Sequence, residues 1–273
     1  EEFDFVITNP PFSITFGDGE DANDYKNRFL FSDKKNSENL FIERWYQLLK
    51  EGGRLAAVLP DSVFDTTENK YIRLFIYRFF NVKAIVSLPK SAFEPYTSTK
   101  TSILFAQKKK AKEVALWDKK WDEVSNDYRY KKTRVENIVS VHDGLKKKEK
   151  LTSIKNMTEE EEHALICEFL KDFLVKKDKE LDCDSLIEKY RLELSDLCSY
   201  DKDTVETFGR VNTWWVFNEV SRFFDYEVFM AEVDNIGYKR TKRGEKETQN
   251  DLYSLEYAPK IVFCSPVVIA RPE

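Results

Sequence analysis

The residues that could carry chemistry form a four-residue motif near the start of the sequence, Asn9-Pro10-Pro11-Phe12. The amide oxygen of Asn9 and the carbonyl of Pro10 can both accept hydrogen bonds from a single NH₂ group. Because proline has no N–H and a fixed φ, that carbonyl is held rigidly. An aromatic ring such as Phe12 can stack on the ring that bears the amine. The motif therefore indicates alkylation of a planar amine, with its lone pair oriented by two acceptors.

The elements that must position this motif follow an alternating pattern. Residues 2–8 are largely apolar and predict a buried strand, which the prolines end. Apolar periodicity further on predicts two amphipathic helices, the first ended by Gly52-Gly53, and three more strands. The helices are expected at 38–51 and 68–80, and the strands at 54–59, 82–88 and 101–107.

Alternating strands and helices over residues 1–108 predict an α/β fold with a largely parallel sheet. The last two strands are joined by SAFEPYTSTK, which is too short for a crossover helix, so we expect this pair to be antiparallel. In an open α/β sheet, ligands bind beyond the carboxyl ends of the strands. The loops that leave such ends are Asn9–Phe12, Pro60–Phe64 and Pro89–Lys100.

The remaining segments are less regular. The polar stretch 13–37 predicts a long loop that could close over a ligand, or an unstructured excursion. Residues 109–150 read as a basic connecting segment, with one further strand at Val114–Trp117. A mainly helical acidic region is expected over 151–234, with helices near 158–177 and 184–198, and the segment 235–273 contains a strand-like stretch, IVFCSPVVIA.

Composition excludes several classes of protein. The chain has 273 residues, 41% of them hydrophobic, which is typical of a globular protein. No apolar run approaches the ~20 residues of a membrane helix, and no signal peptide is visible. Four cysteines without CxxC spacing and two histidines argue against a disulfide framework and against a metal site. We therefore expect a soluble cytoplasmic protein with reduced thiols, no metal and no membrane partner.

The motif and the segments after it resemble a known family. Asn9–Phe12 is similar to the catalytic motif of amino-group methyltransferases that use S-adenosylmethionine. The segments Glu51–Pro60 and Ile85–Pro89, followed by Lys100–Phe105, resemble the adenine-N6 DNA methyltransferase (M) subunit of type I restriction–modification systems. Gly237-Tyr238 with Asn250-Asp251-Leu252 is similar to the end of such catalytic regions.

The resemblance implies a fold class and a function. The fold would be the C-terminal half of a doubly wound, Rossmann-like methyltransferase sheet, followed by a mainly helical region. The function would be adenine-N6 methylation of double-stranded DNA, with a specificity subunit and a restriction subunit as partners. Other readings remain open: a single-chain DNA modification enzyme, an RNA or protein-amide methyltransferase, or a degenerate non-catalytic subunit used for assembly or DNA contact.

The resemblance also implies roles for individual residues. Asn9 and Pro10 would accept hydrogen bonds from adenine N6, and Phe12 would stack on the base, which must leave the duplex to be reached. Phe93 or Tyr96 would form an aromatic wall, unless both only pack in the fold. The catalytic residues would thus be Asn9, Pro10, Pro11 and Phe12, the substrate-binding residues Phe12, Phe93 and Tyr96, and the cofactor-binding residues Asn9 and Pro11.

The family's cofactor side is not recognisable in this sequence. A complete member has a Gly-rich turn after its first strand and an acidic residue for the ribose hydroxyls, and neither precedes Asn9. Glu1 is not a methionine, and the methionines are Met157 and Met230. We therefore expect a piece of a longer protein that begins just before the motif, binds S-adenosylmethionine weakly or not at all, and is inactive alone.

The net charge of −5 argues against a nucleic-acid partner when taken alone, but the charge is uneven. Residues 100–150 hold 15 Lys and Arg against 8 Asp and Glu, whereas 151–234 hold 10 against 21. Lysines in the basic stretch could neutralise DNA phosphates, although a solvated face would have the same composition. The candidate DNA-binding residues are Lys108, Lys109, Lys110, Lys131 and Lys132.

Overall fold

A computed structural model describes residues 2–12, 14, 28–31, 37–241, 244–252 and 260–264, with the side chains of 241 and 260–264 left aside. The described residues fall into two compact units, which are taken separately here. The first combines residues 1–118 with 221–273, and the second comprises 119–220. These bounds differ from the ranges expected from the sequence, because the C-terminal segment returns to the first unit.

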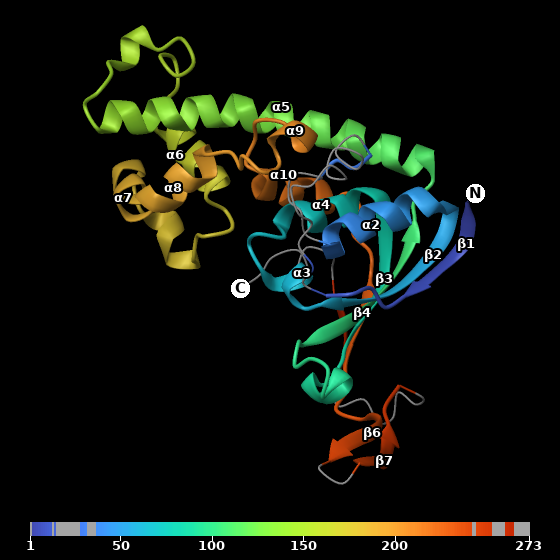
Figure 1. Ribbon diagram of the computed structural model, residues 1–273. Helices are drawn as coiled ribbons and strands as arrows, with labels where there is room; N and C mark the ends of the chain where they lie inside the picture. Colours follow the sequence, from blue (N-terminus) through green and yellow to red (C-terminus); the bar gives the residue numbers. More distant parts are fainter. Residues whose placement is uncertain are drawn as a thin grey trace. The chain divides into compact units, whose positions relative to one another are not determined.

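The first unit contains a six-stranded sheet in the order β1-β2-β4-β3-β5-β8, of which Figure 1 labels β1 to β4. Strands β1 and β2 are parallel, as are β3 and β5, whereas β4 runs antiparallel to both of its neighbours and β8 runs antiparallel to β5. The antiparallel pairing predicted for the strands at 82–88 and 101–107, which are β3 and β4, is thus confirmed. The strands are β1 Phe3–Thr8, β2 Leu49–Pro60, β3 Phe80–Ser87, β4 Thr101–Lys108, β5 Val228–Glu232 and β8 Lys260–Cys264.

Short helices and a hairpin complete this unit. Helices α2 and α4 cover one face of the sheet (Figure 1), and their buried side chains include Trp45, Ile72 and Phe75. The hairpin is a separate two-stranded sheet. The bounds are α2 Ser37–Leu48, α3 Ser62–Asp65, α4 Lys70–Phe79, the 3-10 turn η2 Lys90–Phe93, and the hairpin strands β6 Ile236–Thr241 and β7 Gly244–Asn250.

The opposite face of the sheet carries exposed apolar side chains. In the strand register, Ile7 lies beside Ala56, and Ala56 lies beside Phe105. Ile7 is 82% exposed, and Phe5 and Phe105 are exposed as well. Because β1 is an edge strand, its outer backbone groups have no strand partner among the described residues. This face and edge are therefore open to another segment or chain.

Several expectations from the sequence are wrong in their details. The strand at 2–8, which was predicted to be buried, forms β1 but exposes Phe5 and Ile7. The helix predicted at 38–51 ends at Leu48, and Gly52-Gly53 lies inside β2 instead of ending a helix. Leu49 is fully buried and pairs with Phe3 of β1, so strand pairing takes precedence over the helical pattern. The strand predicted at Val114–Trp117 belongs to α5, Ala111–His142, whose buried residues continue at helical spacing through Trp117, Trp121 and Tyr128.

Helix α5 carries the chain from the first unit into the second, which is helical throughout its described elements. The predicted helix 158–177 ends earlier, at Phe169, and the predicted helix 184–198 is divided into α7 and α8. The elements are the 3-10 turns η3 Lys148–Lys150 and η4 Lys176–Glu180, with α6 Glu159–Phe169, α7 Cys183–Lys189, α8 Arg191–Cys198, α9 Val205–Phe208 and α10 Thr213–Ser221. Among the described residues, no helix is both long and apolar enough to span a membrane. The loop predicted at 13–37 lies mostly outside the described residues.

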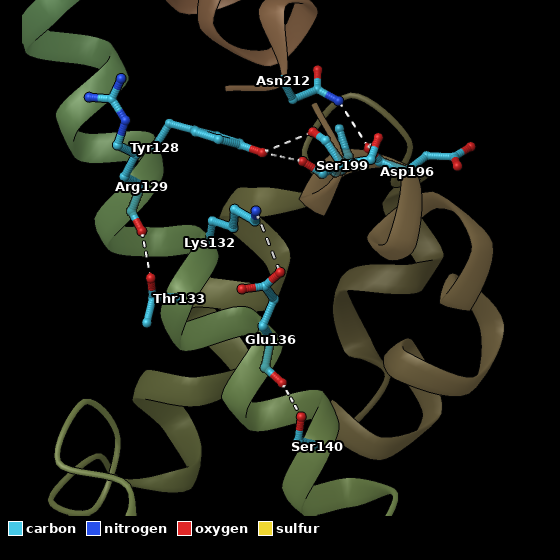
Figure 2. Close-up of polar contacts among 10 residues, drawn as sticks. Tyr128, Arg129, Lys132, Thr133, Glu136, Ser140, Asp196, Ser199 and Asn212 are labelled. Carbon is cyan, nitrogen blue, oxygen red and sulfur yellow. Dashed lines mark hydrogen bonds and ion pairs between the residues drawn. The ribbon is translucent and has the colours of Figure 1, made fainter. Parts of the chain in front are cut away.

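The second unit is organised around Tyr128 of α5. Its ring lies 5.9 Å from that of Phe169, nearly parallel to it, and 5.4 Å from that of Trp215. Its hydroxyl donates a 2.6 Å hydrogen bond to the carbonyl of Leu197 at the end of α8, with the carbonyl of Ser199 at 3.4 Å (Figure 2). Burial raises the pKa of this hydroxyl, which therefore stays a donor.

Replacing Tyr128 by Phe tests this arrangement. The substitution keeps the ring but leaves the buried carbonyl of Leu197 without its donor, which costs about 1–3 kcal/mol. Tyr130→Phe on the same helix is the matched control, because Tyr130 is exposed and its ring contact with Arg134 is retained. Urea unfolding followed by far-UV circular dichroism should show a lower midpoint for Tyr128→Phe only. Equal midpoints for the two variants would contradict the assigned role.

Candidate active site

The candidate site lies at the edge where four parallel strands end. Strands β1, β2, β3 and β5 finish at Thr8, Pro60, Ser87 and Glu232, which the pairing register places at one edge of the sheet. Asn9 comes directly after β1 at this edge. The position agrees with the rule that ligands bind beyond the carboxyl ends of parallel strands.

Within the motif, the four residues differ in exposure. Pro10 is buried, Phe12 is half-buried, and Asn9 and Pro11 are exposed. A buried proline with fixed φ anchors the turn, while the Asn9 side chain is left accessible to a ligand.

Of the two aromatic candidates, the structure brings Phe93 to the motif. The rings of Phe12 and Phe93 lie 5.9 Å apart at 81°, an edge-to-face contact. Phe93 closes the turn η2 and is half-buried. Tyr96 is 86% exposed, so its side chain is free to meet a partner molecule. The roles of both residues toward a base stay predictions.

The loop that carries Phe93 is held at its two ends by Lys100. The ammonium of Lys100 donates a 2.7 Å hydrogen bond to the hydroxyl of Ser87 and a second, short one to the carbonyl of Leu88. The backbone N–H of Leu88 donates to the carbonyl of Thr101 at 2.9 Å. The end of β3 and the start of β4 are therefore tied together, at the same edge of the sheet as the motif.

Asp61 is a polar residue of this edge that the motif search did not single out. It follows Pro60 at the end of β2, and its carboxylate accepts a 2.7 Å hydrogen bond from the Ser102 hydroxyl. Burial raises the pKa of its carboxyl, while the bond from Ser102 and the charge of Lys100 act to lower it. The sequence signal that could have identified Asp61 is a polar residue directly after a predicted parallel strand.

The lysines proposed for DNA contact at 108–110 make contacts within the protein. Lys108 donates to the carbonyls of Tyr46 and Leu49 at 2.8 and 2.6 Å. Lys109 is buried and donates to the carbonyl of Tyr77 at 2.6 Å, and burial lowers the pKa of its ammonium to about 8. Lys110 is exposed. A phosphate contact by Lys109 would first require breaking its buried bond.

The other two candidates belong to the second unit. Lys131 pairs with the carboxylates of Asp127 and Glu168, each at 2.6 Å, and Lys132 lies 3.6 Å from Glu136 one helical turn away (Figure 2). Burial acts to lower the pKa of Lys131, and the two carboxylates raise it overall. A role of Lys131 and Lys132 in DNA binding stays a prediction.

The sequence predicts that this edge receives a methyl donor. Asn9 and Pro11, the residues predicted to contact it, are exposed. The described residues contain no Gly-rich turn after a parallel strand, which an adenosine moiety would require, although Asp61 places a carboxylate directly after β2. This edge therefore holds the residues predicted for methyl transfer, and a Gly-rich turn for adenosine is not found among the described residues.

Comparison with known proteins bears on this site. The profile of the N-6 DNA methylase family matches residues 1–182, so the chain belongs to that family. A type I restriction enzyme EcoEI methylase subunit from Escherichia coli is 35% identical over 137 residues, which are 49% of this chain and 26% of the relative. The type II restriction enzyme and methyltransferase RM.Eco57I from Escherichia coli is 26% identical over 129 residues, which are 44% of this chain and 13% of that protein.

A methyltransferase subunit of the type I restriction–modification system from Streptococcus thermophilus is 26% identical to this chain, with a TM-score of 0.34, and the match covers 40% of this chain and 24% of the subunit. The chain thus spans about a quarter of the length of the type I relatives it matches.

The contacts of Lys109 lead to a pH-dependent prediction. The pKa of its ammonium is about 8 in the folded state and about 10.4 in an unfolded chain. Between these values the unfolded state binds more protons, so the contribution of Lys109 to stability rises with pH. Relative to Lys109→Met, the wild type should gain about 1–2 kcal/mol of unfolding free energy between pH 7.5 and 9.5.

The measurement is urea unfolding at the two pH values, with Lys110→Met as the control. Lys110 is the exposed neighbour, so its substitution should leave the pH dependence of the wild type unchanged. If Lys109→Met followed the same pH dependence as the wild type, the buried position of the ammonium would be refuted.

Proposed function

We propose that this chain supplies the base-binding and transfer side of an adenine-N6 DNA methyltransferase that works in a restriction–modification system. The observation that carries the proposal is Asn9–Phe12 at the carboxyl end of β1, with Phe93 edge-on to Phe12. Membership in the N-6 DNA methylase family supports the choice of an adenine amino group as the substrate.

In the proposed reaction Asn9 and Pro10 act on the amino group. The Asn9 amide oxygen and the Pro10 carbonyl accept the two N6–H bonds of adenine, which draws electron density onto N6 and orients its lone pair away from the acceptors. S-adenosylmethionine would supply an electrophilic methyl group. The S–CH₃ bond would break as the N6–CH₃ bond forms, which would leave the neutral thioether S-adenosylhomocysteine. N6 would release one proton to water, so a neutral base would result with no basic side chain of altered pKa required.

Aromatic contacts would hold the base once it has left the duplex. N6 of a paired adenine lies inside the stack, so the target nucleotide must be flipped out at a cost of a few kcal/mol. Phe12 offers a face for stacking, and its edge-to-face contact with Phe93 fixes the orientation of that face. Base–aromatic stacking is worth about 1–3 kcal/mol per base, which offsets much of the flipping cost.

We also propose that the adenosine part of the cofactor site is supplied by residues outside this chain. The exposed apolar face at Phe5, Ile7 and Phe105 and the open edge of β1 are suitable surfaces for the segment that carries it. The chain alone would then bind S-adenosylmethionine weakly and be inactive.

The partners of the complete protein are inferred from its relatives. A type I arrangement, with double-stranded DNA, a specificity subunit and a restriction subunit, is supported by the 35% identity to the EcoEI methylase subunit. A single-chain enzyme is the alternative, since a type II restriction enzyme and methyltransferase matches over a similar length at 26%. Recovery of the complete protein from its host with or without other subunits would distinguish them.

Substitution of Asn9 tests the chemistry. In the complete protein, Asn9→Ala should lower the rate of adenine-N6 methylation by at least about 100-fold, because it removes a preorganised acceptor at the reacting atom. Binding of S-adenosylmethionine should be largely unchanged. Asn126→Ala, at an exposed position of α5, is the control and should retain activity. Methylation is measured as N6-methyladenine in duplex DNA, and an active Asn9→Ala enzyme would refute the assigned role.

The isolated chain offers a separate test. Isothermal titration of residues 1–273 with S-adenosylmethionine should give no micromolar binding, because the residues that hold the adenosine moiety are not found in its described part. The complete protein serves as the positive control in the same buffer. Micromolar binding by the isolated chain would show that the cofactor site lies within it.

A further inference from the structure

The hairpin β6–β7 contacts the loop that carries Phe93. The hydroxyl of Tyr238 in β6 donates a 2.7 Å hydrogen bond to the carbonyl of Ala92 in η2. Ala92 is buried in a small apolar cluster with Leu88 and Val233, against which Phe93 and Ile236 pack. One side of the turn therefore rests on the core of the sheet and the other is held by a tyrosine from the hairpin.

The backbone before Tyr238 determines where its hydroxyl points. The pairing register between β6 and β7 shifts between Ile236 and Tyr238, and Gly237 at this shift has a φ of +92°, in the region that favours glycine. A Cβ at Gly237 would lie 3.0 Å from the Asn250 side chain. Such irregularities in a ladder redirect the next side chain, here toward Ala92.

Asp251 fixes the neck of the hairpin, which is the place where Asp234 and Asn235 lead into β6 and Asp251 follows β7. Its buried carboxylate accepts hydrogen bonds from the backbone N–H groups of Asp234 at 3.0 Å and Asn235 at 2.9 Å. Its own N–H donates to the carbonyl of Asn235 at 2.9 Å. The hairpin therefore leaves β5 in one direction, which makes the position of Tyr238 reproducible.

We propose that Tyr238 is a positioning residue of the base pocket: its bond to Ala92 fixes the turn η2 so that Phe93 meets Phe12 edge-on. This inference rests on the proposed function, since it gives Tyr238 a role in holding the flipped base. Tyr238 acts through Phe93, so its effect requires the Phe93 ring.

The test uses Tyr238→Phe in the complete methyltransferase with its partner subunits. Without the hydroxyl, kcat/KM for duplex DNA should fall about 3- to 10-fold, the loss that one neutral hydrogen bond produces, mainly through a higher KM for DNA. The fluorescence rise of 2-aminopurine at the target position, which reports flipping, should be smaller. Tyr200→Phe is the matched control, since Tyr200 and Tyr238 are each 40% exposed.

Two measurements separate positioning from general destabilisation. Amide hydrogen exchange in residues 90–97 should become several-fold faster in Tyr238→Phe, with the melting temperature and exchange in β1 and β2 unchanged. In a Phe93→Ala background, adding Tyr238→Phe should cause little further loss of kcat/KM. Unchanged amide exchange at residues 90–97 would overturn the proposal. So would a loss of kcat/KM on adding Tyr238→Phe that is as large in the Phe93→Ala background as in the wild type.

The proposed function can fail separately from this inference. If the wild-type complete protein does not methylate adenine, or if Asn9→Ala remains active, the proposed function is refuted, and a role for Tyr238 in base binding falls with it. If Asn9→Ala is inactive while Tyr238→Phe equals wild type in every measurement, only the positioning role is refuted.

Discussion

The antiparallel course of β4 is the constraint on which the candidate site depends. Because β4 lies between β2 and β3 and runs against both, the connection from β3 must begin and end at the same edge of the sheet. That edge is also where β1 ends and Asn9 begins. A parallel β4 would have required a crossover, and the turn that carries Phe93 would not return beside Phe12.

The two faces of the sheet differ in how much of their apolar surface is covered. One face is closed by α2 and α4, which bury residues such as Trp45 and Phe75. The other face leaves Ile7 and Phe105 in contact with solvent. Each Å² of apolar surface that stays exposed forgoes about 25 cal/mol of stabilising free energy that burial would give. The site at the edge is therefore supported from the helical side, and a segment docking on the bare face would stabilise the same strands.

Much of the sheet could be predicted from the sequence because prolines and apolar runs are local signals. Pro10 and Pro60 mark two strand ends, and the short link before β4 indicates its direction. The end of α2 could not be predicted in this way, since Leu49 becomes a strand residue only by pairing with Phe3, far away in the sequence. The role of Lys109 was also invisible, because a count of charges does not show that an ammonium is buried against the Tyr77 carbonyl. The motif Asn9–Phe12 is a local signal in the sequence, whereas the contacts of Lys100 and Tyr238 exist only in the folded edge.

The contact between Tyr238 and Ala92 joins residues 146 positions apart. Between them the chain completes β4, enters a helical unit and returns to the sheet at β5. Closing so long a connection costs only slightly more entropy than closing a short one, because the cost grows with the logarithm of its length. An inserted unit of this size can therefore change in length and surface while β5 keeps its register beside β3 and the hairpin keeps its neck at Asp251. A protein that ended after the helical unit would therefore retain Asn9–Phe12 but lose Tyr238, whose hydroxyl donates to the Ala92 carbonyl in the turn that carries Phe93.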